Sequence, residues 1–487
     1  MTDRAPYLPW TPEWSRLAVR GRVVVKVASG EAPDRVPHTR DVAVGREVAP
    51  TFFDGGGRVD ATILRFSPAL RVARVFRPRE AGSVRRPRWD AVEDDTGLSR
   101  TFRIDLDGDA DLVALLQELA DLAVVESACP QYLAVTPFAA PAVAEPAEDR
   151  WYAHRMIGAA EALSLEPGDS ALITGVVDSG ADLRHPELQQ KLRPGVDTVD
   201  MAGSELPRSV RLLGDIEGRD RIAQDLVGHG TACAAIIGGK GINIPQGLGG
   251  ETRVFPARAL AGAKVVGRTS LTALGTLTDI DLALKLAIDL QARVVNCSFG
   301  TPESALRDRD PRPHADIVSY ARRRGCTLVA ASGNSGDRSR SYPACLDGVI
   351  AVGSVGPEGR PSGFSTRGDH VDLCAPGERV PSASVGGYGS HTGTSFAAPF
   401  VTGACALLLA RAARLSEPAE PELLREVVMS SARPFGRGVD ADGCGTGILD
   451  VPAALRLLER RLAGDGEASR EREPAGRTEP HAMGPSP

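Results

Sequence analysis

The chain lacks a continuous apolar stretch near its N-terminus. Residues 1–22 carry Asp3, Trp10, Glu13 and several prolines, and they are not followed by the hydrophobic run that a signal peptide requires. We therefore expect a cytoplasmic protein, with unconventional export as an open alternative. No later segment reaches the ~20 uninterrupted apolar residues that span a bilayer, and the best candidate is the Ala/Leu-rich segment after Pro399. The sequence thus predicts a soluble protein with no membrane partner.

Clustered charge and paired cysteines are also missing. The net charge of -6 is spread over 487 residues without a long basic run, which argues against a nucleic-acid or membrane-surface partner. The eight cysteines are scattered singly, and the absence of a Cys-x-x-Cys pair argues against a zinc or redox centre. Most are expected to be reduced and buried. Cys326 and Cys345 bracket one loop and could form a disulfide in an oxidising compartment; free thiols in a cytoplasm are the alternative.

A chain of this length, with 42% hydrophobic residues, predicts two or three folded units. Arg22–Lys26 and Thr101–Leu106 have the pattern of strands, and leucines between Asp109 and Leu122 recur at helical spacing. Strand character resumes over Ala123–Glu126. These segments predict a small α+β domain within residues 1–135, in which residues 51–95 show no clear pattern.

Composition divides the rest of the chain. Residues 136–150 are rich in Pro and Ala with acidic residues and predict an extended linker. From 151 to 462, apolar strand-like segments alternate with helical ones, which is typical of a mostly parallel sheet covered by helices on both faces, an α/β domain. Residues 463–487 mix charges with Pro and Gly and predict a disordered tail.

Two titratable residues stand at the ends of predicted elements. Asp178 follows the apolar strand ending in Val176-Val177, at the edge where open α/β sheets bind ligands. His229 lies between two glycines where a buried helix begins, so its ring is approachable. Taken alone, each also has an ordinary explanation, as a turn or cap residue and as a structural histidine.

A serine and an asparagine complete the set. Ser395 opens an Ala/Val/Leu-rich helix, whose first backbone N–H groups have no acceptor in the helix and can stabilise an oxyanion. Asn334 lies in the loop Ser332-Gly333-Asn334-Ser335-Gly336 and offers an uncharged N–H donor to the same space. The commoner roles of such residues are a helix N-cap for Ser395 and a turn former for Asn334.

Together, these four motifs resemble the subtilisin-like serine peptidases in order, flanking residues and relative spacing. The segments are Val176-Val177-Asp178-Ser179-Gly180, Gly228-His229-Gly230-Thr231, Ser332-Gly333-Asn334 and Gly393-Thr394-Ser395-Phe396-Ala397-Ala398-Pro399. The resemblance implies a serine endopeptidase acting on peptides or proteins through an acyl-enzyme. Ser395 would be the nucleophile, His229 the general base, Asp178 its orienting partner and Asn334 an oxyanion donor. No cofactor is implied.

The resemblance also assigns the substrate-binding residues. Ser298, Phe299 and Gly300 would form the strand edge that pairs with the substrate backbone. Ala331, Ser332 and Gly333 would form one wall of the primary specificity pocket, and Ser341 its floor. Because no charge is evident there, we expect apolar or uncharged side chains next to the cut.

Two further positions relate to the family. Cys233 stands where proteinase-K-like members carry a cysteine, and it implies either sensitivity to mercurials or inert packing. Glu187 stands where many relatives have an aspartate that helps to bind calcium, and residues 241–250 only loosely match the calcium loop. A structural calcium ion is therefore compatible with the sequence but is not predicted, and no metal ligand is assigned.

The N-terminal domain is similar to the pro-region that many subtilisin-like enzymes carry, although it is longer. It would block the cleft as an intramolecular inhibitor, and Ser395 would cut the linker. Two other functions are considered: a catalytically silent, peptide-binding relative, and an esterase of the α/β-hydrolase type. The second needs Gly-x-Ser-x-Gly, and Ala397 replaces the second glycine.

Overall fold

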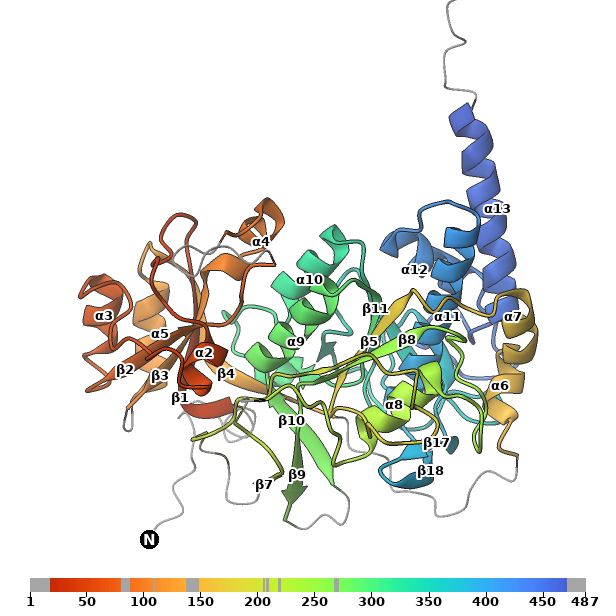
Figure 1. Cartoon of the computed structure of the whole chain (residues 1–487), viewed down its shortest axis with the longest axis horizontal. Coiled ribbons are helices and arrows are strands. Elements are labelled where there is room, and N and C mark those ends of the chain that lie inside the picture. Colours follow the sequence, from red (N-terminus) through yellow and green to blue (C-terminus); the bar gives the residue numbers. More distant parts are fainter. Residues whose placement is uncertain are drawn as a thin grey trace, which may run out of the picture.

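Two seven-stranded sheets organise the chain (Figure 1). The computed structural model describes residues 18–79, 88–107, 110–136, 149–204, 206, 210–217, 220–266 and 271–470. One sheet, in the order β16-β15-β13-β11-β5-β8-β6, belongs to the C-terminal part of the chain. The other, β2-β3-β1-β4-β10-β9-β7, contains strands from both parts.

The first sheet is parallel throughout. Its strands are β5 (Ile173–Asp178), β6 (Val196–Asp197), β8 (Arg253–Arg258), β11 (Ala292–Cys297), β13 (Thr327–Ala331), β15 (Val349–Val355) and β16 (Leu373–Pro376). Successive residues face opposite sides, so Val176 and Val294 enter one hydrophobic core while Val177 and Val295 enter the other. A sheet buried on both faces explains why these strands are apolar at nearly every position.

Helices cover both faces, as the sequence predicts. One core contains α6 (Tyr152–Met156), α7 (Ala159–Leu165), α8 (His229–Gly238), α11 (Thr394–Arg414), α12 (Pro421–Ser430) and α13 (Val451–Arg470); the other contains α9 (Leu277–Asp289) and α10 (Ala315–Arg323). Among the described residues, α11 is the one helix long and apolar enough to cross a membrane. It is the central core helix, because 89% of its most apolar stretch is buried inside the protein.

The N-terminal domain is an antiparallel sheet with short helices. It contains β1 (Ala18–Val27), β2 (Leu70–Arg74), β3 (Thr101–Leu106), β4 (Val125–Val135), α2 (Thr39–Ala43), α3 (Arg58–Ile63), α4 (Ala91–Asp95), η1 (Leu98–Arg100) and α5 (Leu112–Ala120). The expected helix begins later than predicted, because the Asp111 side chain accepts from the N–H groups of Val113 and Ala114 and caps it. Asp109 lies outside the described residues.

Strand β4 joins the two parts of the chain. It pairs with β1 on one side and, through Leu133–Val135, with β10 (Thr272–Thr276) on the other. The sheet then continues through β9 (Ala261–Val265) and β7 (Val210–Leu213). The short pairs β12 (Thr301–Pro302) with β14 (Ser341–Tyr342) and β17 (Val380–Ser384) with β18 (Gly387–His391), and η2 (Glu303–Ala305), complete the elements.

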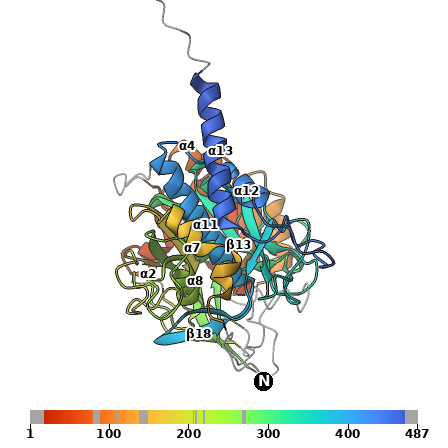
Figure 2. The same ribbon diagram turned by 90° about the vertical axis from the view of Figure 1, so that its right-hand side faces the viewer.

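The predicted linker and tail are described only in part. Residues 137–148 of the linker lie outside the described residues. Helix α13, which projects from the body in Figures 1 and 2, runs to Arg470, so residues 463–470 are helical rather than part of a disordered tail. No proline stops the helix before Pro474, and residues 471–487 are outside the description. All eight cysteines are free thiols, and seven are buried, which leaves Cys326 and Cys345 unbridged.

Candidate active site

Asp178 is the last residue of β5, at the carboxyl edge of the parallel sheet. It is fully buried, and its Oδ1 accepts a hydrogen bond of 2.7 Å from the N–H of Ser179. Its backbone carbonyl accepts from the N–H groups of Ala259 and Leu260, which fixes the end of the strand. The carboxylate is therefore held in one orientation by the sheet itself.

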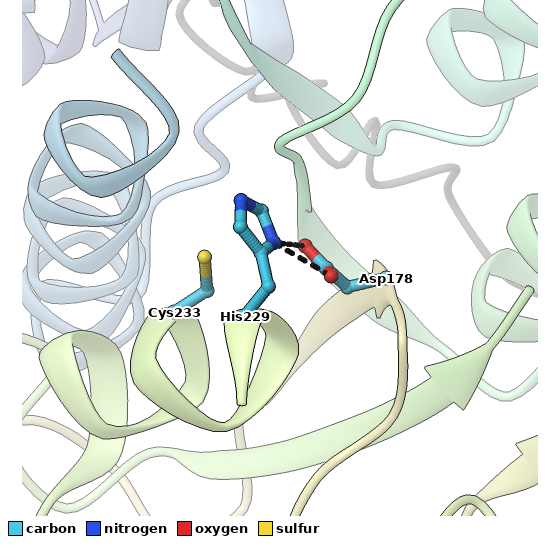
Figure 3. A group of neighbouring side chains, drawn as sticks. All are labelled: Asp178, His229 and Cys233. Atoms are coloured by element: carbon cyan, nitrogen blue, oxygen red, sulfur yellow. Dashed lines mark hydrogen bonds and ion pairs between the residues drawn. The ribbon is translucent and has the colours of Figure 1, made fainter. Parts of the chain in front are cut away.

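His229 is the first residue of α8 and faces that carboxylate (Figure 3). Its Nδ1 lies 2.8 Å from Oδ1 and 2.9 Å from Oδ2 of Asp178. Because a carboxylate only accepts, Nδ1 carries the proton, and in the neutral ring Nε2 has the lone pair that a general base needs. Gly228 precedes the helix with φ 92°, a left-handed conformation that favours glycine.

The surroundings of His229 favour its charged form. Burial of the ring lowers its pKa, but the charge and hydrogen bond of Asp178 outweigh this, and the pKa of His229 is raised above the ordinary value. Asp225 contributes in the same direction. This buried aspartate also accepts from the N–H and Oγ1 of Thr231, near the start of α8. The sequence analysis did not identify Asp225.

Ser395 lies in the first turn of α11. Its backbone carbonyl accepts from Ser298 Oγ at 2.8 Å and from the Cys233 thiol at 3.4 Å. The rings of His229 and Phe396 are 5.2 Å apart, so the imidazole packs against the same turn. These contacts hold Ser298 and Cys233 against Ser395, although the three residues are far apart in the sequence.

The expected hydrogen bond between Ser395 and His229 is not formed. The Ser395 hydroxyl points to the carbonyl of Ser298, at 3.5 Å, and within the described part of the chain Nε2 of His229 has no hydrogen-bond partner. Catalytic hydrogen bonds are often long or misaligned without substrate. A pairing of Ser395 with His229 would require the hydroxyl to turn from the Ser298 carbonyl to Nε2.

Asn334 lies next to the start of α11. Its Oδ1 accepts from the N–H of Thr394 at 2.9 Å and from the Thr394 hydroxyl at 2.8 Å, which fixes the amide orientation. Nδ2 is then on the side of Gly393, where a Cβ would lie only 3.0 Å from it. With φ 147° and ψ 158°, Gly393 has a conformation almost restricted to glycine. This explains the glycine two residues before Ser395.

The predicted substrate-binding residues gather around the same edge. Ser298, Phe299 and Gly300 follow β11, and Ser332 and Gly333 follow Ala331, the last residue of β13. Strand β14, with Ser341, pairs with β12, which follows Gly300 directly. A Cβ on Gly300 would lie 2.4 Å from Ser341 Oγ, so the predicted floor of the pocket is in contact with the strand edge. Sequence reasoning missed Thr366, whose Oγ1 would contact a Cβ on Gly333 at 2.8 Å.

Cys233 lies one helical turn after His229 (Figure 3). Ligand atoms of Asp178, His229 and Cys233 are within 4.8 Å of one another. Burial raises the pKa of the Cys233 thiol well above its ordinary value, so the thiol stays protonated. Donation to the Ser395 carbonyl gives this sulfur a packing role at the site.

A buried carboxylate that orients an imidazole, beside a serine at a helix N-terminus, defines the class of serine hydrolases. Comparison with known proteins narrows the class. The model of the "Subtilase family" (Peptidase S8) matches residues 169–450, more than half of the chain. The chain therefore belongs to the subtilase family and is a subtilisin-like serine peptidase.

Individual relatives agree with this assignment. The chain is 32% identical to thermitase of Thermoactinomyces vulgaris over 262 residues, which are 53% of this chain and 82% of that protein. It is 33% identical to the major intracellular serine protease of Bacillus subtilis over 239 residues, 48% of this chain and 66% of that one. It spans 54% of the length of a thermophilic serine proteinase from a Bacillus species, to which it is 34% identical over 51% of this chain.

Solved structures show the same likeness. A protease from Pseudoalteromonas arctica matches with a TM-score of 0.53 and 25% identity, over 66% of this chain and 99% of that one. The prenylagaramide maturation protease matches with a TM-score of 0.50 and 26% identity, over 62% of this chain and 98% of that one. The similarity therefore covers the fold of almost the whole of each neighbour.

Proposed function

We propose that the chain is a serine endopeptidase in which Asp178, His229 and Ser395 form the catalytic triad. The observation that carries this proposal is the buried Asp178–His229 pair, bonded at 2.8 and 2.9 Å beside the first turn of α11. Asp178 fixes the ring and its tautomer and stabilises the imidazolium that forms during the reaction. The raised pKa of His229 supports this role.

Each proton and bond in the reaction has a place at this site. The Ser395 oxygen bonds to the substrate carbonyl carbon while its proton moves to Nε2 of His229. The tetrahedral oxyanion would accept hydrogen bonds from Nδ2 of Asn334 and from the Ser395 N–H. The imidazolium then gives its proton to the leaving amine as the C–N bond breaks. Water, deprotonated by the same nitrogen, then attacks the acyl-enzyme. The ester C–O bond breaks, the imidazolium returns its proton to the Ser395 oxygen, and the acid product leaves.

Peptide hydrolysis tests this function directly. Once processed and diluted so that the N-terminal domain dissociates, the wild-type protein should release the chromophore from an uncharged peptide anilide, and a Ser395→Ala protein, which keeps the buried framework, should not. The uncharged residues Gly300 and Ser341, which are in contact, and Gly333 support a preference for apolar or uncharged side chains before the cut. Equal activity of the Ser395→Ala protein would contradict the assignment of the nucleophile.

We infer that the N-terminal domain inhibits the same site. The end of β4 lies between two backbone edges of the peptidase domain. Val135 and Gly300 exchange hydrogen bonds of 3.1 and 2.9 Å, and the N–H of Thr136 donates to the carbonyl of Ala273 at 2.9 Å. Gly300 is one of the residues expected to pair with substrate, so β4 uses the edge that a substrate strand would need.

Side-chain contacts support stable docking of this domain over α9 and α10. Lys26 pairs with Asp316 at 2.9 Å, and Tyr132 donates to Asp310 at 2.5 Å. Glu93 of α4 pairs with Lys285 of α9 at 2.7 Å, and these side chains are 0% and 1% exposed. Val75, Phe76 and Leu98 also pack into the core that contains α9 and α10. The N-terminal domain is therefore held by side-chain contacts in addition to the backbone pairing of β4.

We also propose that the linker is self-processed. Thr136, the last described residue before the linker, is hydrogen-bonded at the expected substrate-binding edge, which supports cleavage by Ser395 between Val135 and Trp151. Intact-mass measurement of purified wild-type protein should find two fragments with a junction in this range, and the Ser395→Ala protein should stay whole. Complete processing of the Ser395→Ala protein would contradict autocatalysis without affecting the peptide-hydrolysis result.

A further inference from the structure

The loop that follows α8 is built around one carboxylate. Glu187, fully buried in the segment after β5, accepts hydrogen bonds from four consecutive backbone N–H groups. Gly241 and Ile242 donate to Oε2 at 2.8 and 3.0 Å, and Asn243 and Ile244 donate to Oε1 at 2.6 and 3.3 Å. Both carboxylate oxygens are thus saturated by N–H donors, which form an anion-binding nest.

The loop points N–H donors inward, whereas a calcium site requires oxygen ligands that point inward. A calcium ion takes six to eight oxygen ligands, chiefly carboxylates and carbonyls that point inward. Residues 241–244 instead point their N–H groups at Glu187, and the positive ends of these dipoles would repel a cation there. The residues at this position therefore do not fit the calcium ion that the family resemblance raises.

Carbonyls close to the nest also have donors of their own. The Gln246 carbonyl lies 2.9 Å from Nε2 of His154, in α6. Burial lowers the pKa of His154 to about 4, so the ring is neutral at pH 7 and Nε2–H donates. At the end of α8, the carbonyls of Ile236 and Ile237 accept from the N–H groups of Leu248 and Gly249 at 2.9 and 2.7 Å. Hydrogen bonds to α6 and α8 therefore hold the loop in place.

We propose that the loop of residues 239–249 keeps its fold through Glu187, as an internal anion, and binds no cation there. In this chain the Glu187 carboxylate would hold the loop by direct hydrogen bonds. Elsewhere in the family a shorter aspartate and a bound ion would hold the corresponding loop. The stability of this loop should consequently be independent of calcium, whatever the substrate of the enzyme.

Hydrogen exchange followed by mass spectrometry measures the exchange rates of the four donor amides, residues 241–244, directly. The protein would carry Ser395→Ala to prevent autolysis, and it would be measured in excess calcium chloride and in excess EDTA. We expect the amides of residues 241–244 to exchange at the same rate in both. Faster exchange of these amides in EDTA would overturn the proposal, and this arm leaves Glu187 unchanged and needs no peptidase activity.

A second arm tests Glu187 itself. Glutamine keeps the shape but presents an NH₂ group to two of the donors, and hydrogen bonds to charged groups contribute ~1.5–3 kcal/mol, so exchange at residues 241–244 should rise about tenfold or more. The matched control is Glu166→Gln, another fully buried glutamate, which accepts from Gly168 and Arg414. It should leave residues 241–244 unchanged. Slow exchange retained in the Glu187→Gln protein would overturn the proposal.

Discussion

Replacing Glu93 by glutamine tests how firmly the N-terminal domain is docked. Lys285 is held by Glu93 and by Asp289, each at 2.7 Å, and the ammonium group lies 5.3 Å from the Tyr320 ring. Removing one partner of a buried ion pair costs ~3–5 kcal/mol. Because Asp289 still faces Lys285, we expect the lower end, ~3 kcal/mol, which corresponds to about 100-fold weaker docking.

The assay needs a docking equilibrium that does not depend on catalysis. A Ser395→Ala protein, with a recognition site for another protease inserted in the segment 137–148, can be cut and then diluted while native mass spectrometry measures the bound fraction. The control is Asp95→Asn, because its bond to Arg323 joins side chains that are 59% and 43% exposed and should contribute little. Equal weakening by Glu93→Gln and Asp95→Asn would refute the reasoning. Replacing Glu93 and Lys285 together by leucine should restore part of the docking.

Three further predictions concern the peptidase site. Asn334→Ala should lower kcat by ~10²–10³-fold with a small change in KM, which is the loss that removing the oxyanion asparagine causes in subtilisin; a few-fold loss would exclude the oxyanion role. Asp178 raises the pKa of His229, and only the neutral ring can accept the serine proton, so kcat/KM should rise with pH through a midpoint above the ordinary histidine value, ~6.5. In the Asp178→Asn protein the residual activity should have a lower midpoint, and an unchanged midpoint would contradict the pairing. Because its pKa is raised, the Cys233 thiol should not react with iodoacetamide at pH 8. Wild-type and Cys233→Ser proteins should therefore keep the same fraction of activity after treatment, and a loss of activity in the wild type alone would show a reactive thiol.

Local sequence signals were sufficient to place single residues at the ends of elements. Asp178 after a buried strand, and Ser395 at the start of an apolar helix, can be placed because strand and helix patterns are strong there, whereas their proposed roles required the family resemblance. Helices on both faces of the sheet follow from the same patterns. The contact between Ser341 and Gly300 required the family resemblance, since no local pattern relates residues 41 positions apart.

Contacts made between distant segments could not be predicted in the same way. Strand β10 is short and contains Gly275, so it gives a weak strand signal, and its partner in β4 is 140 residues away. Residues 51–95 looked irregular because β2 and α4 are short and depend on tertiary packing, α4 on the buried Glu93–Lys285 pair. The role of Glu187 depends on N–H groups from a loop more than 50 residues later, and composition carries no sign of it.

The most direct test of the proposed triad is the rate of labelling by a fluorophosphonate, a small reagent that reports an activated serine. We expect stoichiometric labelling on Ser395 in the wild-type protein and a loss of several orders of magnitude in rate for His229→Ala. Label on another residue, or equal labelling rates for the wild-type and His229→Ala proteins, would contradict the account.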